Sequence, residues 1–213
     1  MINKRIKQGF DNLHNDNHKI KFCLGALALV AICVLLLIIS TFTQIKLNFN
    51  LPSHGIDSYL KFEYIPQIPV VIFIAALLGE VWGVFSVLIY IVMGLTPWFP
   101  VFALGGGASY IFQYNFGYIF AYIFSVILCA KELKRGNGIL NIIFAMLYGV
   151  LTIHVIGIIY MIIIALIRHD SFQFMQNWIY YQSLSKILYD IIFGILAILL
   201  AKGCRKMLWL VMG

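Results

Sequence analysis

The sequence predicts an all-α, polytopic membrane protein with six transmembrane helices. Of its 213 residues, 62% are hydrophobic and only 11% are charged, whereas roughly a quarter of the residues of a soluble domain are charged. The apolar residues form long blocks, as membrane-spanning helices of about 20 residues do. The 15 Lys and Arg residues lie in short clusters between these blocks, which is typical of orientation signals and argues against one nucleic-acid-binding patch.

The apolar blocks divide the chain into one membrane domain with two polar ends. Residues 1–19 form a basic N-terminal segment, residues 20–201 the six-helix domain, and residues 202–213 a basic tail. The segments that we expect to cross the membrane are 20–42, 66–78, 81–95, 110 or 116 to 130, 139–167 and 184–201.

The second and third of these segments come from one block, residues 65–95, which is too long for a single span. Gly79, Glu80 and Gly83 interrupt it near the middle, so we divide it there into two short spans. Five long spans are the competing count. Residues 44–63 and 168–185 are expected to be polar loops, and the first could contain a short helix.

The distribution of positive charge predicts the orientation. With six spans and the N-terminus inside, 11 of the 15 Lys and Arg residues lie on the inner side and four on the outer side. Inner loops of membrane proteins are enriched in Lys and Arg, so both termini are expected in the cytoplasm. The glycine-rich loop at 105–107 and the start of the last helix then lie on the outer side.

Few ionisable residues fall within the spans, and each is a functional candidate because charge inside a membrane is costly. Lys186 and Asp190 are four residues apart and share one face of the last helix. Together they could bind a polar ligand, with Lys186 contacting a carboxylate and Asp190 accepting hydrogen bonds from N–H groups. Alternatively, they form a structural ion pair. His154 could bind a ligand or hydrogen-bond another helix. Glu80 is interpreted as a solvated or helix-capping carboxylate.

Other chemistry finds little support in the sequence. The four cysteines lack C-x-x-C spacing and fit a role as small packing residues, so we expect neither a metal nor a cofactor. Neither H-E-x-x-H, a P-loop nor a G-x-S-x-G elbow is present, and an enzyme is therefore not expected. Any ATP-driven work would come from another subunit.

Several motifs between residues 65 and 201 resemble the BioY family of biotin transporters. The Pro-Val-Phe-Ala stretch followed by glycines is the most specific of them. The matching residues are Leu78-Gly79, Gly83, Val87, Tyr90, Gly94-Leu95, Pro100-Val101-Phe102-Ala103, Gly105-Gly106-Gly107, Gly117-Tyr118 and His154-x-x-Gly157-x-x-Tyr160.

The resemblance implies a substrate-binding S component of an energy-coupling factor transporter, in a bacterial cell membrane. Such a component has six helices, cytoplasmic termini and a vitamin site toward the outer side, and it works with a transmembrane T subunit and two ATPases. The candidate biotin-binding residues are Asp190, Lys186, Tyr90, Phe102, Gly105, Gly106, Gly107, Tyr118 and His154.

The sequence departs from the family pattern at three places. The family's Asp-x-x-Lys in the last helix would put Lys at Phe193, so that Lys186 is the nearest cation to Asp190. The family's Gln in the second helix finds no match within 70–73, and Ala26, Ala28 and Ala31 do not form its Ala-x-x-x-Ala in helix 1. An S component for another small vitamin or acid, and a non-transporting scaffold subunit, are the alternative functions.

Overall fold

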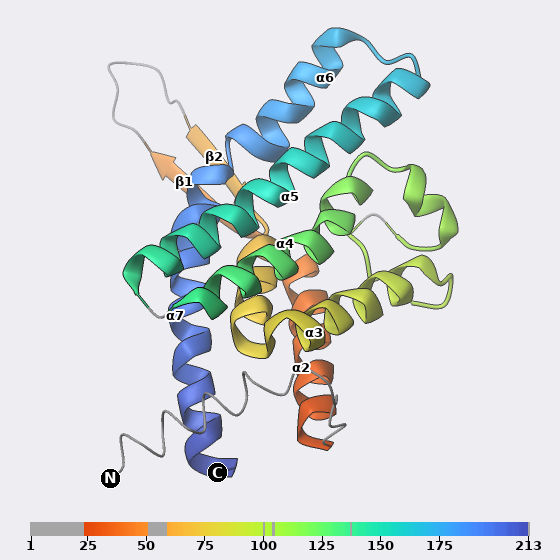
Figure 1. Cartoon of the computed structure of the whole chain (residues 1–213). Coiled ribbons are helices and arrows are strands. Elements are labelled where there is room, and N and C mark those ends of the chain that lie inside the picture. Colours follow the sequence, from red (N-terminus) through yellow and green to blue (C-terminus); the bar gives the residue numbers. More distant parts are fainter. Residues whose placement is uncertain (1–23, 51–58, 100, 104, 137, 213) are drawn as a thin grey trace.

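The computed structural model describes residues 24–50, 59–99, 101–103, 105–136 and 138–212. The predicted N-terminal segment, residues 1–19, lies outside the described residues. The described residues are mostly helical, as predicted (Figure 1). The elements are α2 (Leu24–Phe42), β1 (Ile45–Asn50), β2 (Tyr59–Tyr64), α3 (Gln67–Leu95), the 3₁₀-helix η1 (Ala108–Phe112), α4 (Phe116–Arg135), α5 (Ile139–Ile167), α6 (Phe172–Ile179), the π-helix η2 (Tyr180–Leu184) and α7 (Ile187–Met212).

The multi-pass membrane class is confirmed, but the count of six helices is corrected. Within the described residues, five helices are long and apolar enough to cross a membrane, the last of them counted from Phe172 through Leu208. The number is lower than predicted because the expected second and third spans are counted together as α3, in which two helical arms join across a kink. The arms meet at Gly79, whose backbone leaves the helical region (φ 77°, ψ −165°).

Helix α3 doubles back at this bend, and Figure 1 shows its two arms running in different directions. The Gln67 side chain at its start hydrogen-bonds the Tyr90 hydroxyl near its end, at 3.0 Å. A straight helix would hold these two residues about 35 Å apart. The arms also pack closely, since a Cβ added to Gly83 would lie 3.6 Å from the Ile74 carbonyl oxygen. The division predicted from the glycines therefore lies where the chain bends.

Replacing Gly79 by alanine should destabilise the fold by about 1–3 kcal/mol, because only glycine adopts its backbone conformation cheaply. An added Cβ would meet nothing within 4 Å, so the cost is one of backbone strain alone. Thermal unfolding of the purified protein in detergent measures it. Gly203→Ala, at a helical glycine with equally open surroundings, is the matched control; an equal melting temperature for both variants would contradict the strained bend.

Two predicted loops are regular structure instead. Residues 45–50 and 59–64 pair as an antiparallel hairpin in which Ile45 faces Tyr64 and Asn50 faces Tyr59. Apolar and polar residues alternate in both strands, which is the pattern of a strand. The second predicted loop, 168–185, is helical over α6 and η2, because Ser171 caps α6 by accepting a hydrogen bond from the Phe174 N–H at 3.2 Å. Helix α7 also continues beyond residue 201, into the predicted tail.

Helices α4 and α5 pack through a reciprocal pair of contacts between glycine and tyrosine. A Cβ on Gly117 of α4 would lie 2.3 Å from the Tyr160 side chain of α5, and a Cβ on Gly157 of α5 would lie 2.5 Å from the Tyr118 ring of α4. Only glycine leaves room for these rings. The glycines and tyrosines of two of the motifs, Gly117-Tyr118 and Gly157-x-x-Tyr160, thus form packing surfaces that fix the position of Tyr118.

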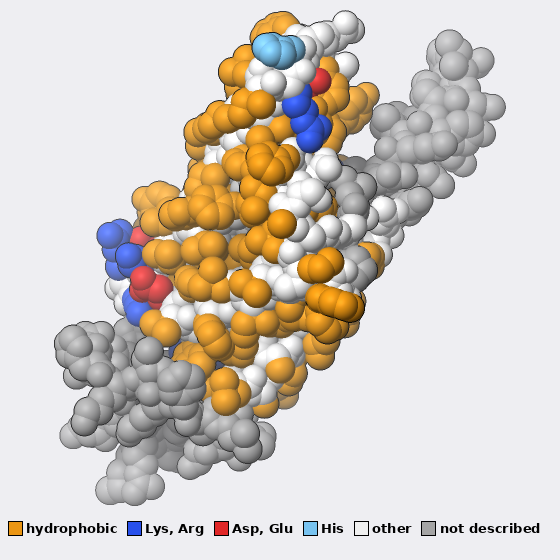
Figure 2. Space-filling view, turned by 90° about the vertical axis from the view of Figure 1, so that its right-hand side faces the viewer, with side chains coloured by type: hydrophobic (Ala, Val, Ile, Leu, Met, Phe, Trp, Pro, Cys, Tyr) orange, Lys and Arg blue, Asp and Glu red, His pale blue; other side chains and the backbone are white. Residues whose placement is uncertain are grey.

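Among the side chains coloured in Figure 2, charged ones gather near the top and at the left edge of the view, and a broad apolar surface lies between them. At the α3 bend, Glu80 lies 3.6 Å from both Lys131 and Lys134 of α4. The Arg205 guanidinium of α7 donates to the Ala76 carbonyl at the end of the first arm, at 3.3 Å. Glu80, interpreted from the sequence as a solvated or helix-capping carboxylate, thus keeps 28% of its side chain exposed and pairs with the neighbouring helix.

Candidate binding pocket

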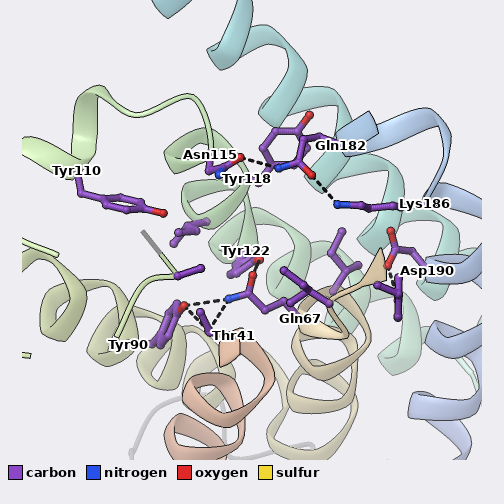
Figure 3. Close-up of a pocket in the computed structure, with 15 residues that line it drawn as sticks. Thr41, Gln67, Tyr90, Tyr110, Asn115, Tyr118, Tyr122, Gln182, Lys186 and Asp190 are labelled. Atoms are coloured by element: carbon purple, nitrogen blue, oxygen red, sulfur yellow. Dashed lines mark hydrogen bonds between the residues drawn. The ribbon is translucent and has the colours of Figure 1, made fainter. Parts of the chain in front are cut away.

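A pocket opens at the end of the helices away from the α3 bend (Figure 3). The end of α2, the hairpin's last residue, both ends of α3 and the first turns of α4 and α7 all contribute to its walls. Its polar lining residues are Thr41, Tyr64, Gln67, Tyr90, Tyr110, Asn115, Tyr118, Tyr122, Gln182, Lys186 and Asp190. The remaining lining residues are Ile65, Ile68, Ala103 and Ile119. Tyrosines and apolar side chains thus surround two charged groups.

Asp190 is the most enclosed charged group of the pocket, with 2% of its surface exposed. The Tyr64 hydroxyl donates to Oδ1 at 2.6 Å, and His154 Nε2 lies 3.1 Å from Oδ2. Burial, followed by the charge of Asp190 and the hydrogen bond to it, raises the pKa of Tyr64 well above its ordinary value. Tyr64 therefore remains a hydrogen-bond donor to Asp190 across the physiological pH range.

Lys186 lies one helical turn before Asp190 and is oriented by two amides. Its Nζ donates to Gln182 Oε1 at 2.5 Å, and Gln182 Nε2 donates to Asn115 Oδ1 at 2.9 Å. This chain of contacts links the start of α4 to the π-helix before α7 (Figure 3). It holds an ammonium group at the pocket wall, where it can meet an anion.

The opposite wall of the pocket is neutral and extensively hydrogen-bonded. Gln67 Nε2 donates to Thr41 Oγ1 at 2.6 Å and to the Tyr90 hydroxyl at 3.0 Å. The Tyr122 hydroxyl donates to Gln67 Oε1 at 3.1 Å, and the Thr41 and Tyr90 oxygens are 2.8 Å apart. Four groups from three helices thus satisfy one another, which fixes the aromatic rings of this wall.

Four of the nine candidate residues line the pocket: Tyr90, Tyr118, Lys186 and Asp190. His154, which is 3% exposed, lies behind Asp190. Phe102 lies behind Tyr90 and Tyr110, with ring centroids 5.4 and 4.5 Å away.

Gly105, Gly106 and Gly107 do not line the pocket either, but they shape the loop that carries Phe102. Gly105 (φ 116°) and Gly107 (φ 94°) adopt conformations that favour glycine. The Gly107 N–H donates to the Gly94 carbonyl at 2.9 Å. The Phe102 ring packs directly on Gly94, because a Cβ added to this glycine would lie 2.1 Å from the ring. The loop therefore supports the pocket from outside.

Sequence reasoning missed the neutral polar residues of the pocket. Gln67 is the first residue of α3, one turn before the range 70–73 in which we sought an amide. Asn115 lies between the two alternative starts of the fourth predicted span, 110 and 116, and Gln182 lies in a predicted loop. Polar residues are common at such positions, so these three did not stand out in the sequence. Their place in the pocket follows from the bend of α3 and from the helical form of residues 172–184.

Comparisons with known proteins agree on one family and one fold. The sequence model of the BioY family matches residues 14–209. Among solved structures, the S-component for biotin from an ECF-type ABC transporter is similar, with a TM-score of 0.66 and 22% identity over 89% of this chain and 95% of that chain. The search of curated proteins found no match.

Proposed function

The chain belongs to the BioY family, and we propose that it is the membrane-embedded substrate-binding component of a vitamin uptake transporter, capturing biotin from the outer side. The pocket carries this proposal. It brings a carboxylate and an ammonium group, Asp190 and Lys186, together with aromatic walls among membrane helices. Intramembrane ionisable residues of this kind mark substrate sites.

The chemistry of biotin matches the two charged groups. Asp190 accepts hydrogen bonds from the ureido N–H groups, and Lys186 meets the carboxylate of the side chain. Tyr90 and Tyr118 form walls for the fused rings. Phe102 and the Gly105–Gly107 loop hold Tyr90 in place, and His154 acts from behind Asp190.

Equilibrium binding of radiolabelled biotin to the purified protein in detergent tests the function. Saturable binding, competed by unlabelled biotin, supports the proposal. Binding of a different vitamin or small acid in place of biotin would keep the transporter class and change the ligand. No binding of any such compound would favour the scaffold alternative, in which the chain only assembles with other membrane subunits.

Changing Lys186 to Gln should weaken biotin binding by about 10-fold to 100-fold, because an ionic hydrogen bond to the carboxylate is lost. The same variant should bind biotin methyl ester as the wild type does, since the ester carries no charge for Lys186 to meet. Titration of both ligands measures the difference. Lys206→Gln, at an exposed lysine away from the pocket, is the control, and an equal loss for both ligands would exclude the carboxylate contact.

We propose that both termini are cytoplasmic and that the pocket faces outward, as the Lys and Arg distribution favours. Five helices are compatible with termini on one side, because α3 doubles back and the Gln67 side chain at its start contacts Tyr90 near its end. In a variant without the native cysteines, Ser109→Cys near the pocket should react with an impermeant maleimide on intact cells. Lys131→Cys, at the α3 bend, should react only after permeabilisation. Both native side chains are exposed. The reverse labelling pattern would contradict this orientation.

We further propose that the chain works with a transmembrane T subunit and two ATPase subunits in the cell membrane. The similar solved structure comes from an ABC transporter. The chain itself carries no P-loop motif, so ATP hydrolysis must come from partners.

A further inference from the structure

Both carboxylate oxygens of Asp190 already have partners before any ligand enters the pocket. Tyr64, from the hairpin, holds Oδ1, and His154, from α5, holds Oδ2. The two partners differ in their position. Tyr64 lines the pocket, whereas His154 is 3% exposed and is not among the lining residues. His154 therefore acts on the pocket only through Asp190.

The geometry assigns the donor in the contact between His154 and Asp190. An ionised carboxylate only accepts hydrogen bonds, so its 3.1 Å contact with Nε2 of His154 requires the proton on that nitrogen. In the part of the chain that the structure describes, the buried Nδ1 has no hydrogen-bond partner. The Tyr118 ring lies edge-on to the imidazole, with centroids 6.3 Å apart at 82°. The ring thus points one N–H at Asp190 and offers nothing to the ligand.

We propose that His154 is a positioning residue for the substrate. Its Nε2–H fixes Oδ2 of Asp190, so that the carboxylate presents its remaining lone pairs to an N–H donor of the ligand. A carboxylate has about four acceptor directions, and hydrogen bonds from the described part of the chain use two of them. The inference rests on the proposed function, because it needs a ligand with N–H groups at Asp190.

Three substitutions at His154 separate positioning from general packing. Glutamine places an N–H donor the same number of bonds from Cβ as Nε2, whereas the donor of asparagine lies one bond closer, at the position of Nδ1. We expect His154→Gln to bind radiolabelled biotin nearly as tightly as wild type. His154→Asn and His154→Leu should bind about 10-fold or more weakly, as for a lost hydrogen bond to a charged group. Equal affinity of the Gln and Asn variants would overturn the proposal.

A double-mutant cycle measures the coupling between His154 and Asp190 in ligand affinity, which a purely structural role of His154 would not produce. With Asp190→Asn as the background, His154→Leu should cause little further loss of affinity, because the carboxylate that it positions is gone. The same fold-loss in both backgrounds would show that His154 acts independently of Asp190 and would overturn the proposal.

The tautomer of His154 can be tested without a ligand. In ¹⁵N-histidine NMR of the apo protein, the signal that His154→Gln removes should show a protonated Nε2 and an unprotonated Nδ1. A protonated Nδ1 with a bare Nε2 would overturn the proposal even if biotin binds. Failure of wild-type protein to bind biotin, with the expected tautomer present, would instead count against the proposed ligand.

Discussion

Changing Asp190 to Asn should weaken biotin binding by about 100-fold or more. The substitution keeps the size of the side chain but removes the charge that strengthens each hydrogen bond from the ureido group. It also turns one acceptor into an amide donor, which would face the Tyr64 hydroxyl or the His154 Nε2. Equilibrium binding of radiolabelled biotin measures the loss, and thermal unfolding reports how much of it comes from the fold.

The protein contains its own control for this substitution. Asp170 also accepts a hydrogen bond from a tyrosine hydroxyl, that of Tyr114 at 2.6 Å, the same distance as between Tyr64 and Asp190. Asp170 lies outside the pocket. Asp170→Asn therefore removes an equivalent tyrosine–carboxylate contact without touching the ligand. If both variants lose affinity equally, the loss at Asp190 does not reflect ligand recognition.

The sequence predicts best those parts of the fold that follow from the distribution of apolar residues along the chain and from the residues that interrupt it. Residues 139–167 form a helix with the predicted bounds, because a predominantly apolar run without Asp, Glu, Lys or Arg lies between Gly138 and Arg168. The bend at Gly79 was also located, since a glycine in mid-span with a charged neighbour is costly in a continuous helix. The hairpin was missed because its strands are short and lie within a segment whose general polarity indicated a loop.

The candidate site divides in a similar way. Lys186 and Asp190 stood out in the sequence because charge within an apolar helix requires an explanation, and both line the pocket. Gln67, Asn115 and Gln182 carry no charge and lie at helix ends, where polar residues are common. Their convergence depends on the doubling back of α3 and on the helical turn before α7. Three-dimensional proximity of this kind leaves no periodic signal in the sequence.

The glycine motifs illustrate a third case, in which the sequence locates important residues without revealing their role. Gly105, Gly106 and Gly107 are candidate biotin-binding residues from the sequence, but in the structure they shape the turn that positions Phe102 behind Tyr90. Likewise, His154-x-x-Gly157-x-x-Tyr160 combines two functions on one helix. His154 contacts Asp190, whereas Gly157 and Tyr160 pack on α4. Spacing alone cannot separate the two roles.

Replacing Gly157 by alanine should both destabilise the protein and weaken ligand binding. The new Cβ would lie 2.5–2.6 Å from three atoms of the Tyr118 ring, and overpacking of this kind costs about 1–3 kcal/mol. Tyr118 cannot move freely, because its hydroxyl is hydrogen-bonded to Ser183 at 2.8 Å and its ring lines the pocket. Thermal unfolding and biotin titration in detergent measure the two effects on the same sample.

A compensating substitution identifies the source of the strain. In a Tyr118→Leu background the ring is absent, so Gly157→Ala should cost much less stability than it does in the wild type. Gly203→Ala on α7, where a Cβ meets nothing within 4 Å, should be neutral or slightly stabilising, since alanine is the better helix former. An unchanged cost of Gly157→Ala in the leucine background would mean that α4 and α5 do not meet through this ring. The pocket wall at Tyr118 would then need another support, because the fit between Gly157 and Tyr118 is what ties the packing of these helices to the shape of the site.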